Sequence, residues 1–417
     1  MSDERIHATY FIETACPVEE AAEVLAGEQS SGTFVQVPGE TADLKERFRA
    51  RVERIEPLEE VAAPSLPGAR VPEGATTFHR ARIEVSFSLE NMGTNLPTLV
   101  ATVAGNLFEL REFSGLKLLD LDVPAAFGEA YLGPQFGIAG TRRLAGVEDR
   151  PIIGTIVKPS VGLTPEQTAD LVGELALADI DFIKDDELMA DPPHSPLGQR
   201  VEKAMAAIDQ AAQKTGKKTM FAFNISDDLD AMLRHHDTVL EAGGTCVMVS
   251  LNSVGLAGVE FLRRRCQLPI HGHRNGWGMF SRSPQLGMEF TAYQKLWRLA
   301  GVDHLHVNAL QNKFCEPDDS VVRSIKAVLT PLLGGFAAMP VLSSGQWGGQ
   351  APETYARTGS VDLMYLAGGG MISHPGGPAA GCTAIRQAWE AAVTGVGLEE
   401  YAQTRPQLRQ SLEKFGG

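Results

Sequence analysis

The sequence predicts an α/β protein of two domains, an N-terminal α+β (ferredoxin-like) domain over residues 1–140 and a C-terminal (β/α)8 TIM barrel over residues 141–417. Three observations lead to this prediction. The chain of 417 residues is too long for one ordinary core. From Pro151 onward, short apolar runs alternate with polar loops and stretches of helical periodicity. The alternation continues through eight units, and about 250 residues is the usual length of such a barrel.

The eight predicted strands of the barrel are apolar, often β-branched, and end on polar side chains. They are PIIGTIVKP (151–159), DFIKDDE (181–187), KTMFAFNIS (218–226), TCVMVSLN (245–252), LPIHGHRN (268–275), HLHVNAL (304–310), MPVLSSG (339–345) and LMYLAGGG (363–370). Helices are predicted between them, most clearly at 164–178, 196–216, 226–244 and 318–333. Several begin on Thr, Ser or Asp, and two end on Gly, as helix caps prefer. An open, doubly wound sheet is the alternative, but it rarely needs eight parallel strands in series.

The N-terminal region has a different pattern, with strand-like and helix-like segments that do not alternate regularly. Strands are predicted at 6–14, 80–89 and 115–124, and helices at 18–29 and 95–110. We interpret this region as a sheet with helices on one face. A Gly-rich stretch, 124–144, links it to the barrel.

Composition excludes several classes of function. With 37 Lys and Arg against 52 Asp and Glu, the net charge is −15, which argues against nucleic-acid binding and against an anionic membrane surface. The long uncharged run at 327–342 contains two prolines and a Gly pair, so no membrane span is expected. The charged N-terminus is unlike a signal peptide. Five cysteines without close spacing fit neither disulfides nor a zinc site, so we expect a cytoplasmic protein.

Polar residues recur where the apolar strands end. In a (β/α)8 barrel these positions surround the active site. They are Lys158, Lys184, Asp186, Glu187, Asn224, Asn252, His273, Arg274, His306, Ser343, Ser344 and Gly368 to Gly370. Because the pattern repeats from strand to strand, it indicates a functional site rather than a set of solvated turns.

The segment DFIKDDE offers ligands for a hard cation. Lys184 and Asp186 are two positions apart, so on a strand they point the same way, and Glu187 can join them as the strand breaks. Two carboxylates with water suit Mg²⁺. The alternatives are a solvated turn and a plain ion-pair network, in which Lys184 is the counter-ion of the carboxylates.

Two further groups predict anion binding. His273 and Arg274 end one strand and His306 ends the next, and arginine recognises anions through two parallel hydrogen bonds. The Gly-rich turns at 343–349 and 366–377 follow the last two strands, where this fold usually binds phosphate. The alternative for the histidines is a structural role in the core.

These motifs resemble the large chain of ribulose-bisphosphate carboxylase and its non-carboxylating relatives, the RuBisCO-like proteins (type IV). The resemblance covers most of the chain. It is carried by KPSVGLTPEQ, DFIKDDE, HGHRNG, DHLHVN, PVLSSG, AGGG with HPGG, EQSSGTF and VAGNLFEL.

The resemblance implies that CO2 carbamylates Lys184, so that the lysine becomes an oxygen ligand of Mg²⁺ beside Asp186 and Glu187. It implies a homodimer, or an assembly of dimers, in which Glu28, Thr33 and Asn106 reach the barrel of the partner. One phosphate would lie on Arg274, His306 and Ser343. A second anionic end would lie on Gly345, Gly368 and Gly369 with Thr33. The catalytic group would comprise Lys158, Lys184, His273, Lys313 and Asn106.

The sequence also departs from the family pattern at positions that touch bisphosphate binding or CO2 capture. Ser160 follows Pro159 where carboxylases have a second lysine, and Lys313 lacks flanking glycines. Phe34 replaces a tryptophan and Ser344 a glycine. Net carboxylation of ribulose bisphosphate is therefore not expected.

Asn106 stands where the methionine-salvage enolases of the family have a lysine base, which disfavours that branch. The remaining branch acts on sugar acids in apionate breakdown. The resemblance then implies Mg²⁺-dependent decarboxylation of 3-oxo-isoapionate 4-phosphate through an enediolate that Lys158 or His273 protonates. Hydrolytic C–C cleavage of the same substrate, or enolisation or isomerisation of a keto or diketo sugar phosphate, are the alternatives. A non-catalytic binding protein that has kept the fold is the contrasting class.

Overall fold

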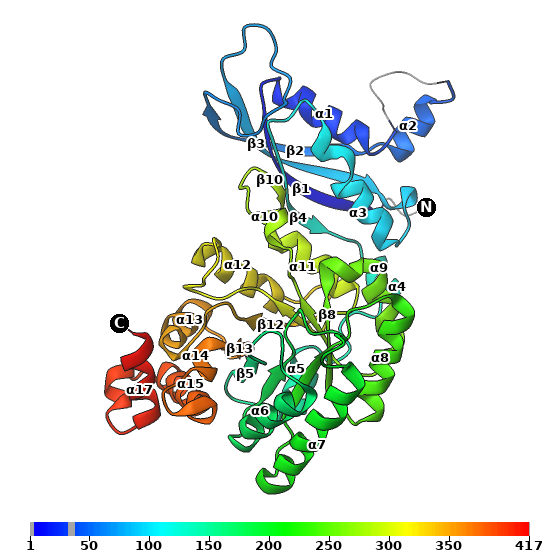
Figure 1. Ribbon diagram of the computed structural model, residues 1–417. Coiled ribbons are helices and arrows are strands. Elements are labelled where there is room, and N and C mark those ends of the chain that lie inside the picture. The colour runs from blue at the N-terminus through cyan, green and yellow to red at the C-terminus, as the bar shows by residue number, and fades with distance from the viewer. Residues whose placement is uncertain (1–3, 32–37, 417) are drawn as a thin grey trace. The chain divides into compact units, whose positions relative to one another are not determined.

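The computed structural model describes residues 4–31 and 38–416. The chain forms two compact units (Figure 1), one made of Met1–Tyr131 with Gly276–Leu299 and the other of Leu132–Asn275 with Ala300–Gly417. Residues 276–299 therefore belong to the first unit, although the sequence pattern does not separate them from the barrel. In the described ranges, none of the helices combines the length and apolar composition needed to cross a membrane.

The first unit contains a mixed five-stranded sheet in the order β10-β4-β1-β3-β2. Its strands are β1 (Arg5–Thr14), β2 (Arg51–Val61), β3 (Phe78–Ser88), β4 (Gly115–Asp122) and β10 (Leu286–Met288). β1 pairs antiparallel with β3 and β4, whereas β10 runs parallel to β4. The sequence predicts β1, β3 and β4 but not β2 or β10. β2 is charged and largely exposed, so it lacks the apolar alternation that marks a strand, and β10 has only three residues.

The helices of the first unit are short, and they connect or flank the strands of this sheet along the sequence. They are α1 (Val18–Glu28), α2 (Ala42–Phe48), η1 (Leu89–Asn91), α3 (Leu96–Ala104), η2 (Asn106–Glu109), α4 (Ala126–Ala130), α10 (Gly278–Ser281) and α11 (Phe290–Leu299). α1 contacts β2, β3 and η2, and α11 contacts β4.

The second unit is a closed barrel of eight parallel strands, as predicted. Its order is β11-β12-β13-β5-β6-β7-β8-β9. The strands are β5 (Ile152–Ile156), β6 (Phe182–Lys184), β7 (Met220–Asn224), β8 (Cys246–Ser250), β9 (Ile270–His273), β11 (His304–His306), β12 (Met339–Leu342) and β13 (Met364–Leu366). Alternate residues of these strands, including Phe182, Met220 and Val341, fill the interior, so the barrel is a packed core.

In the second unit, α5 (Gly137–Ala145) precedes the first barrel strand, and the other helices come after the strands in the expected alternation. They are α6 (Pro165–Leu177), α7 (Leu197–Thr215), α8 (Leu229–Glu241), α9 (Leu251–Arg263), α12 (Asp318–Leu329), η3 (Gly348–Gln350), α13 (Ala351–Thr358), α14 (Gly369–Ile372), α15 (Gly377–Thr394), α16 (Leu398–Ala402) and α17 (Pro406–Phe415). α6 begins with a capping box formed by Thr164 and Gln167, which satisfies backbone groups at its first turn.

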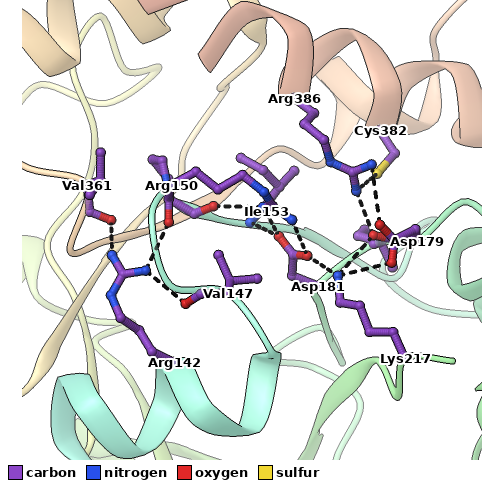
Figure 2. A network of polar contacts seen from close by, with 12 residues as sticks. Arg142, Val147, Arg150, Ile153, Asp179, Asp181, Lys217, Val361, Cys382 and Arg386 are labelled. Carbon is purple, nitrogen blue, oxygen red and sulfur yellow. Dashed lines mark hydrogen bonds and ion pairs between the residues drawn. The ribbon is translucent and has the colours of Figure 1, made fainter. Parts of the chain in front are cut away.

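The N-terminal end of the barrel is held by an ionic network around Asp181 (Figure 2). Asp181 is fully buried and accepts two hydrogen bonds from Arg150, at 2.5 and 2.9 Å. It also accepts the amide of Ile153 at 2.8 Å and the ammonium group of Lys217. Burial alone would raise the pKa of Asp181, but Arg150 and Lys217 bring it below its ordinary value. This end of the barrel is therefore structural and stands opposite the strand ends that carry the candidate site.

We expect Asp181→Asn to lower the free energy of unfolding by about 3 kcal/mol, because it leaves Arg150 and Lys217 without their buried anion. The exposed Asp209→Asn, whose partner is the surface residue Lys218, should change it by less than about 1 kcal/mol. Since folding lowers the pKa of Asp181, its contribution is complete above the unfolded pKa and is lost as the pH falls through the folded pKa. Denaturant titrations at neutral and acid pH measure both effects, and equal losses in the two variants would contradict this role.

Candidate functional site

The side chains of β6 alternate between the barrel interior and the surrounding helices. Phe182 and Lys184 are buried on the inside, whereas Asp185 faces α7 and meets Arg200. Because alternate side chains of a strand point to opposite faces, the acidic residues of DFIKDDE have different surroundings and different roles. Asp186 and Glu187 belong to the site, and Asp185 belongs to its support.

Arg200 fixes the loop that follows β6. Its guanidinium group donates to Asp185 at 3.2 and 3.3 Å and to the carbonyl oxygens of Met189, Ala190 and Ser195 at 2.6 to 2.7 Å. Both charges are nearly inaccessible to solvent, and burial raises the pKa of Asp185 in spite of the arginine. The sequence analysis did not assign this role to Asp185. The period of two along the strand is the signal that could have done so.

Lys184 lies buried at the end of β6. Its side chain is 1% exposed, and its Nζ donates to the carbonyl oxygen of Asp185 at 2.8 Å and lies 3.8 Å from Oε2 of Glu187. Burial lowers the pKa of Lys184, although the charges of Glu187, Asp186 and Asp185 oppose the shift. A lysine with a lowered pKa is more often a neutral amine, which is the form that reacts with CO2.

Lys158 forms an ion pair with Asp186. Its Nζ donates to Oδ2 of Asp186 at 2.7 Å and to Oγ of Ser160 at 2.7 Å. Burial would raise the pKa of Asp186, but the hydrogen bond from Lys158 and the charges of both lysines bring it below its ordinary value. Asp186 is therefore a carboxylate at neutral pH. Ser160, which departs from the carboxylase pattern, contributes directly to the placement of Lys158.

His273 is largely buried beside Glu187, with 15% of its side chain exposed. Its Nε2 lies 3.6 Å from Oε2 of Glu187, and its Nδ1 accepts the amide of Asn275 at 3.3 Å. Since Nδ1 accepts, the proton of the neutral ring lies on Nε2 and faces Glu187. Burial first, and Lys184 second, lower the pKa of His273 to about 4. The ring is therefore neutral near pH 7.

Three further histidines form a buried chain beneath the site. Nε2 of His306 meets Nε2 of His271 at 2.8 Å, and Nδ1 of His271 meets Nδ1 of His304 at 3.3 Å. Nε2 of His304 lies 2.8 Å from Oγ1 of Thr141. Burial lowers the pKa of all three rings, that of His304 to about 3, so the chain is neutral.

The neutral chain has one arrangement that satisfies every member. The hydroxyl of Thr141 donates to the carbonyl of Gly137, so Thr141 accepts from Nε2 of His304. Each following ring then donates to the one before it, which leaves Nδ1 of His306 as an acceptor. That nitrogen lies 3.2 Å from Oγ of Ser343, whose hydroxyl donates to it. The structure thus brings His306 and Ser343 together, and their joint role in binding phosphate stays a prediction.

Arg274 has a partner that the sequence analysis did not identify. Its NH2 donates to Oε2 of Glu316 at 2.8 Å, and both side chains are largely buried. Glu316 lies in the loop between β11 and α12, the loop that also carries Lys313. The pairing brings together two segments 42 residues apart, which no local pattern could show.

The glycine-rich turns lie beside two lysines. A Cβ on Gly345 would contact Lys313 at 3.6 Å, and a Cβ on Gly368 would contact Cε of Lys158 at 3.7 Å. Ser344 and Gly345 have φ angles of +87° and +86°, a backbone conformation that favours glycine. The glycine turns therefore lie beside the side chains of Lys313 and Lys158.

The predicted residues of the first unit lie in one corner of that unit. Glu28 ends α1 and Asn106 begins η2, these two elements contact each other, and both residues are exposed. Thr33 and Phe34 lie outside the described residues. A role for these side chains in the site stays a prediction.

The residues around Lys184 fit the predicted metal. In residues 4–31 and 38–416, no three His, Cys, Asp or Glu side chains are placed together so as to hold a metal ion. Asp186 and Glu187 nevertheless supply two carboxylates beside a buried amine with a lowered pKa. Carbamylation would convert that amine into a third oxygen ligand, which gives the oxygen set that Mg²⁺ prefers.

Known proteins resemble this chain over nearly its whole length. The catalytic domain of the ribulose bisphosphate carboxylase large chain matches residues 137–415, and its N-terminal domain matches residues 2–127. A 3-oxo-isoapionate-4-phosphate transcarboxylase/hydrolase of Xanthobacter autotrophicus is 56% identical, over 98% of this chain and 99% of its own. A 3-oxo-isoapionate-4-phosphate decarboxylase of Rhizobium etli is 52% identical, over 98% of both chains.

Solved structures agree with this relationship. A rubisco-like protein from Burkholderia fungorum superposes with a TM-score of 0.92 at 48% identity, covering 99% of this chain and 100% of its own. A dimeric archaeal Rubisco from Hyperthermus butylicus reaches a TM-score of 0.85 at 28% identity, covering 100% and 97%. The chain therefore belongs to the ribulose bisphosphate carboxylase large-chain family, among its RuBisCO-like proteins.

Proposed function

We propose that this protein is a decarboxylase of 3-oxo-isoapionate 4-phosphate. The observation that carries the proposal is the buried Lys184 beside Asp186 and Glu187, in a chain 52% identical to an enzyme with that activity. The substrate is a β-keto acid with a phosphate. Such a site suits it because cleavage of the bond to the carboxylate leaves negative charge on neighbouring oxygens, which a divalent cation stabilises.

We propose that Mg²⁺ binds through carbamylated Lys184, Asp186 and Glu187. Lys158 must then release Asp186, to which it now donates at 2.7 Å. When bound, the metal would supply positive charge that stabilises the negative charge left on the substrate. The free thiols of the chain, including the exposed Cys315, suit a reducing compartment, and we place the enzyme in the cytoplasm.

The protein's own residues bind the substrate and transfer the proton. As CO2 departs, the electrons of the broken bond remain on the substrate as an enediolate, and one proton must return to carbon. Lys158 is suited to deliver it, because Ser160 still accepts a hydrogen bond from its ammonium group, at 2.7 Å, after Asp186 has turned to the metal. His273 is neutral, and its Nε2 proton faces Glu187, whose Oε2 lies 3.6 Å from Nε2.

A second candidate is the transcarboxylase/hydrolase reaction on the same compound. The relative with that activity is 56% identical over 98% of this chain, slightly more than the decarboxylase. In this proposal both reactions use the same metal ligands. They differ in whether water attacks the ketone or a proton is added to carbon after CO2 has left.

We propose that the active unit is a homodimer or an assembly of dimers. Glu28 and Asn106 are exposed in one corner of the first unit, and the dimeric archaeal Rubisco shares the fold. A second copy of the chain would then bring Glu28, Thr33 and Asn106 to each barrel.

Activation should depend on CO2 and Mg²⁺. We expect turnover of 3-oxo-isoapionate 4-phosphate to rise after preincubation with bicarbonate and Mg²⁺, and Lys184→Ala to abolish it, because alanine cannot form the carbamate. Lys218→Ala, which removes a surface lysine paired with Asp209, is the control and should retain activity. Full turnover by a preparation free of both metal and CO2 would contradict the proposal.

The products should distinguish the two reactions. Decarboxylation releases CO2 and a keto-sugar phosphate one carbon shorter than the substrate, and we expect this result by mass spectrometry. Two shorter acids would instead establish hydrolytic cleavage. If a keto or diketo sugar phosphate were isomerised without loss of carbon, only the enolising capacity of the site would remain.

Mixing two inactive variants should restore activity if the site is shared. In a dimer of Asn106→Ala with Lys184→Ala, one of the two sites is intact. Random exchange should therefore recover about a quarter of wild-type activity. Recovery should require subunit exchange, monitored by native mass spectrometry of a tagged chain. No recovery after proven exchange would place each site within a single chain.

A further inference from the structure

The two ends of the candidate site carry different net charge. At one end, Arg274 is paired with Glu316 at 2.8 Å, with side-chain exposures of 9% and 15%. The cation that would attract an anion there is already balanced by a carboxylate of the same chain. Because both groups are mostly removed from water, the surrounding solvent screens this pair weakly.

Glu316 is held in place by more than the arginine. Its Oε2 also accepts from Nδ2 of Asn308 at 3.1 Å, and its Oε1 accepts from Oγ of Ser320 at 3.0 Å. Its main-chain carbonyl accepts from Nδ2 of Asn312 at 3.0 Å. The donors come from the residue after β9, from the loop after β11 and from α12. Glu316 is therefore a fixed part of this end of the site.

At the glycine end, the side chains of two lysines lie beside the turns. Gly345 lies against Lys313, and Gly368 lies against Lys158. The Nζ of Lys313 lies 5.3 Å from the ring centre of Phe314. Lys158 is bound to Asp186, a carboxylate that would turn to the metal. Positive charge at this end thus remains available to an anionic group of the substrate.

We propose that Glu316 is a specificity-determining residue that excludes a second phosphate from the Arg274 end. The single phosphate of the substrate then binds at the glycine end, and Arg274 faces an uncharged or singly charged group. This inference rests on the proposed function for the identity of the substrate, but the selectivity for monophosphates over bisphosphates follows from the pair itself. A phosphate dianion beside Arg274 would have to lie next to Glu316 or displace it from three donors, and either outcome weakens binding.

The experiment compares two ligands that lack a keto group and so do not react. A pentitol 1,5-bisphosphate and a pentitol monophosphate are titrated by calorimetry into the protein, with Mg²⁺ and bicarbonate present. We expect Glu316→Gln to tighten binding of the bisphosphate by about tenfold or more, since a nearby negative charge is lost while the shape is kept. Binding of the monophosphate should change by less than about threefold.

Two further variants sharpen the test. Glu316→Ala should also raise the affinity for the bisphosphate relative to the affinity for the monophosphate. This second variant keeps the test valid if Glu316→Gln fails to fold. Asp319→Asn removes a negative charge that is 82% exposed and paired with Arg357, and it should leave the ratio unchanged. An unchanged ratio in both Glu316 variants, or an equal shift in Asp319→Asn, would overturn the inference.

The outcome is independent of the proposed reaction. Turnover of 3-oxo-isoapionate 4-phosphate is measured on the same preparations. Wild-type turnover with an unchanged affinity ratio would refute the role of Glu316 and leave the decarboxylase assignment intact. A shifted ratio without turnover of that compound would support the role of Glu316 and remove the assignment of the substrate.

Discussion

The site depends on the burial of the Lys184 amine beside the carboxylates of Asp186 and Glu187, at the end of β6. Lys184 is 1% exposed, and burial lowers its pKa, while Asp186 stays ionised. The neutral amine would not persist in water, where a lysine is protonated at neutral pH, whereas an aspartate is ionised there as well. The barrel brings the two together by directing Lys184 and Asp186 inward and turning the intervening Asp185 outward to Arg200. The chemistry proposed for the protein follows from that separation.

Every buried charge near this site has a definite partner. Asp185 has Arg200, Asp186 has Lys158, and Arg274 has Glu316. Some of these ion pairs are permanent supports of the fold, whereas in others one partner would be replaced when the metal binds. The Asp185 pair is enclosed and holds the loop after β6, whereas the Asp186 pair lies at the opening, where a metal would replace the lysine. The neutral histidine chain below adds rigidity without adding charge, since burial lowers the pKa of each ring.

The sequence predicts what depends on local pattern. All eight barrel strands and their polar ends follow from apolar runs interrupted by charged residues, and Lys184, His273, His306 and Ser343 lie where the strand ends place them. β10 and the exposed β2 lack such a pattern, and nothing local assigns residues 276–299 to the first unit. Glu316 could not be predicted either, because its role comes from a pairing across 42 residues. Charge compensation between distant loops is a property of the fold rather than of any motif.

The central claim is that Lys184 is the amine that CO2 modifies to complete the metal site. ¹³C nuclear magnetic resonance of the protein equilibrated with ¹³C-labelled bicarbonate tests it most directly. We expect a carbamate carbonyl resonance that Mg²⁺ strengthens, and we expect Lys184→Arg to lack it while Lys218→Arg retains it. A catalytically active wild-type protein without that resonance, or the same resonance in Lys184→Arg, would contradict the account.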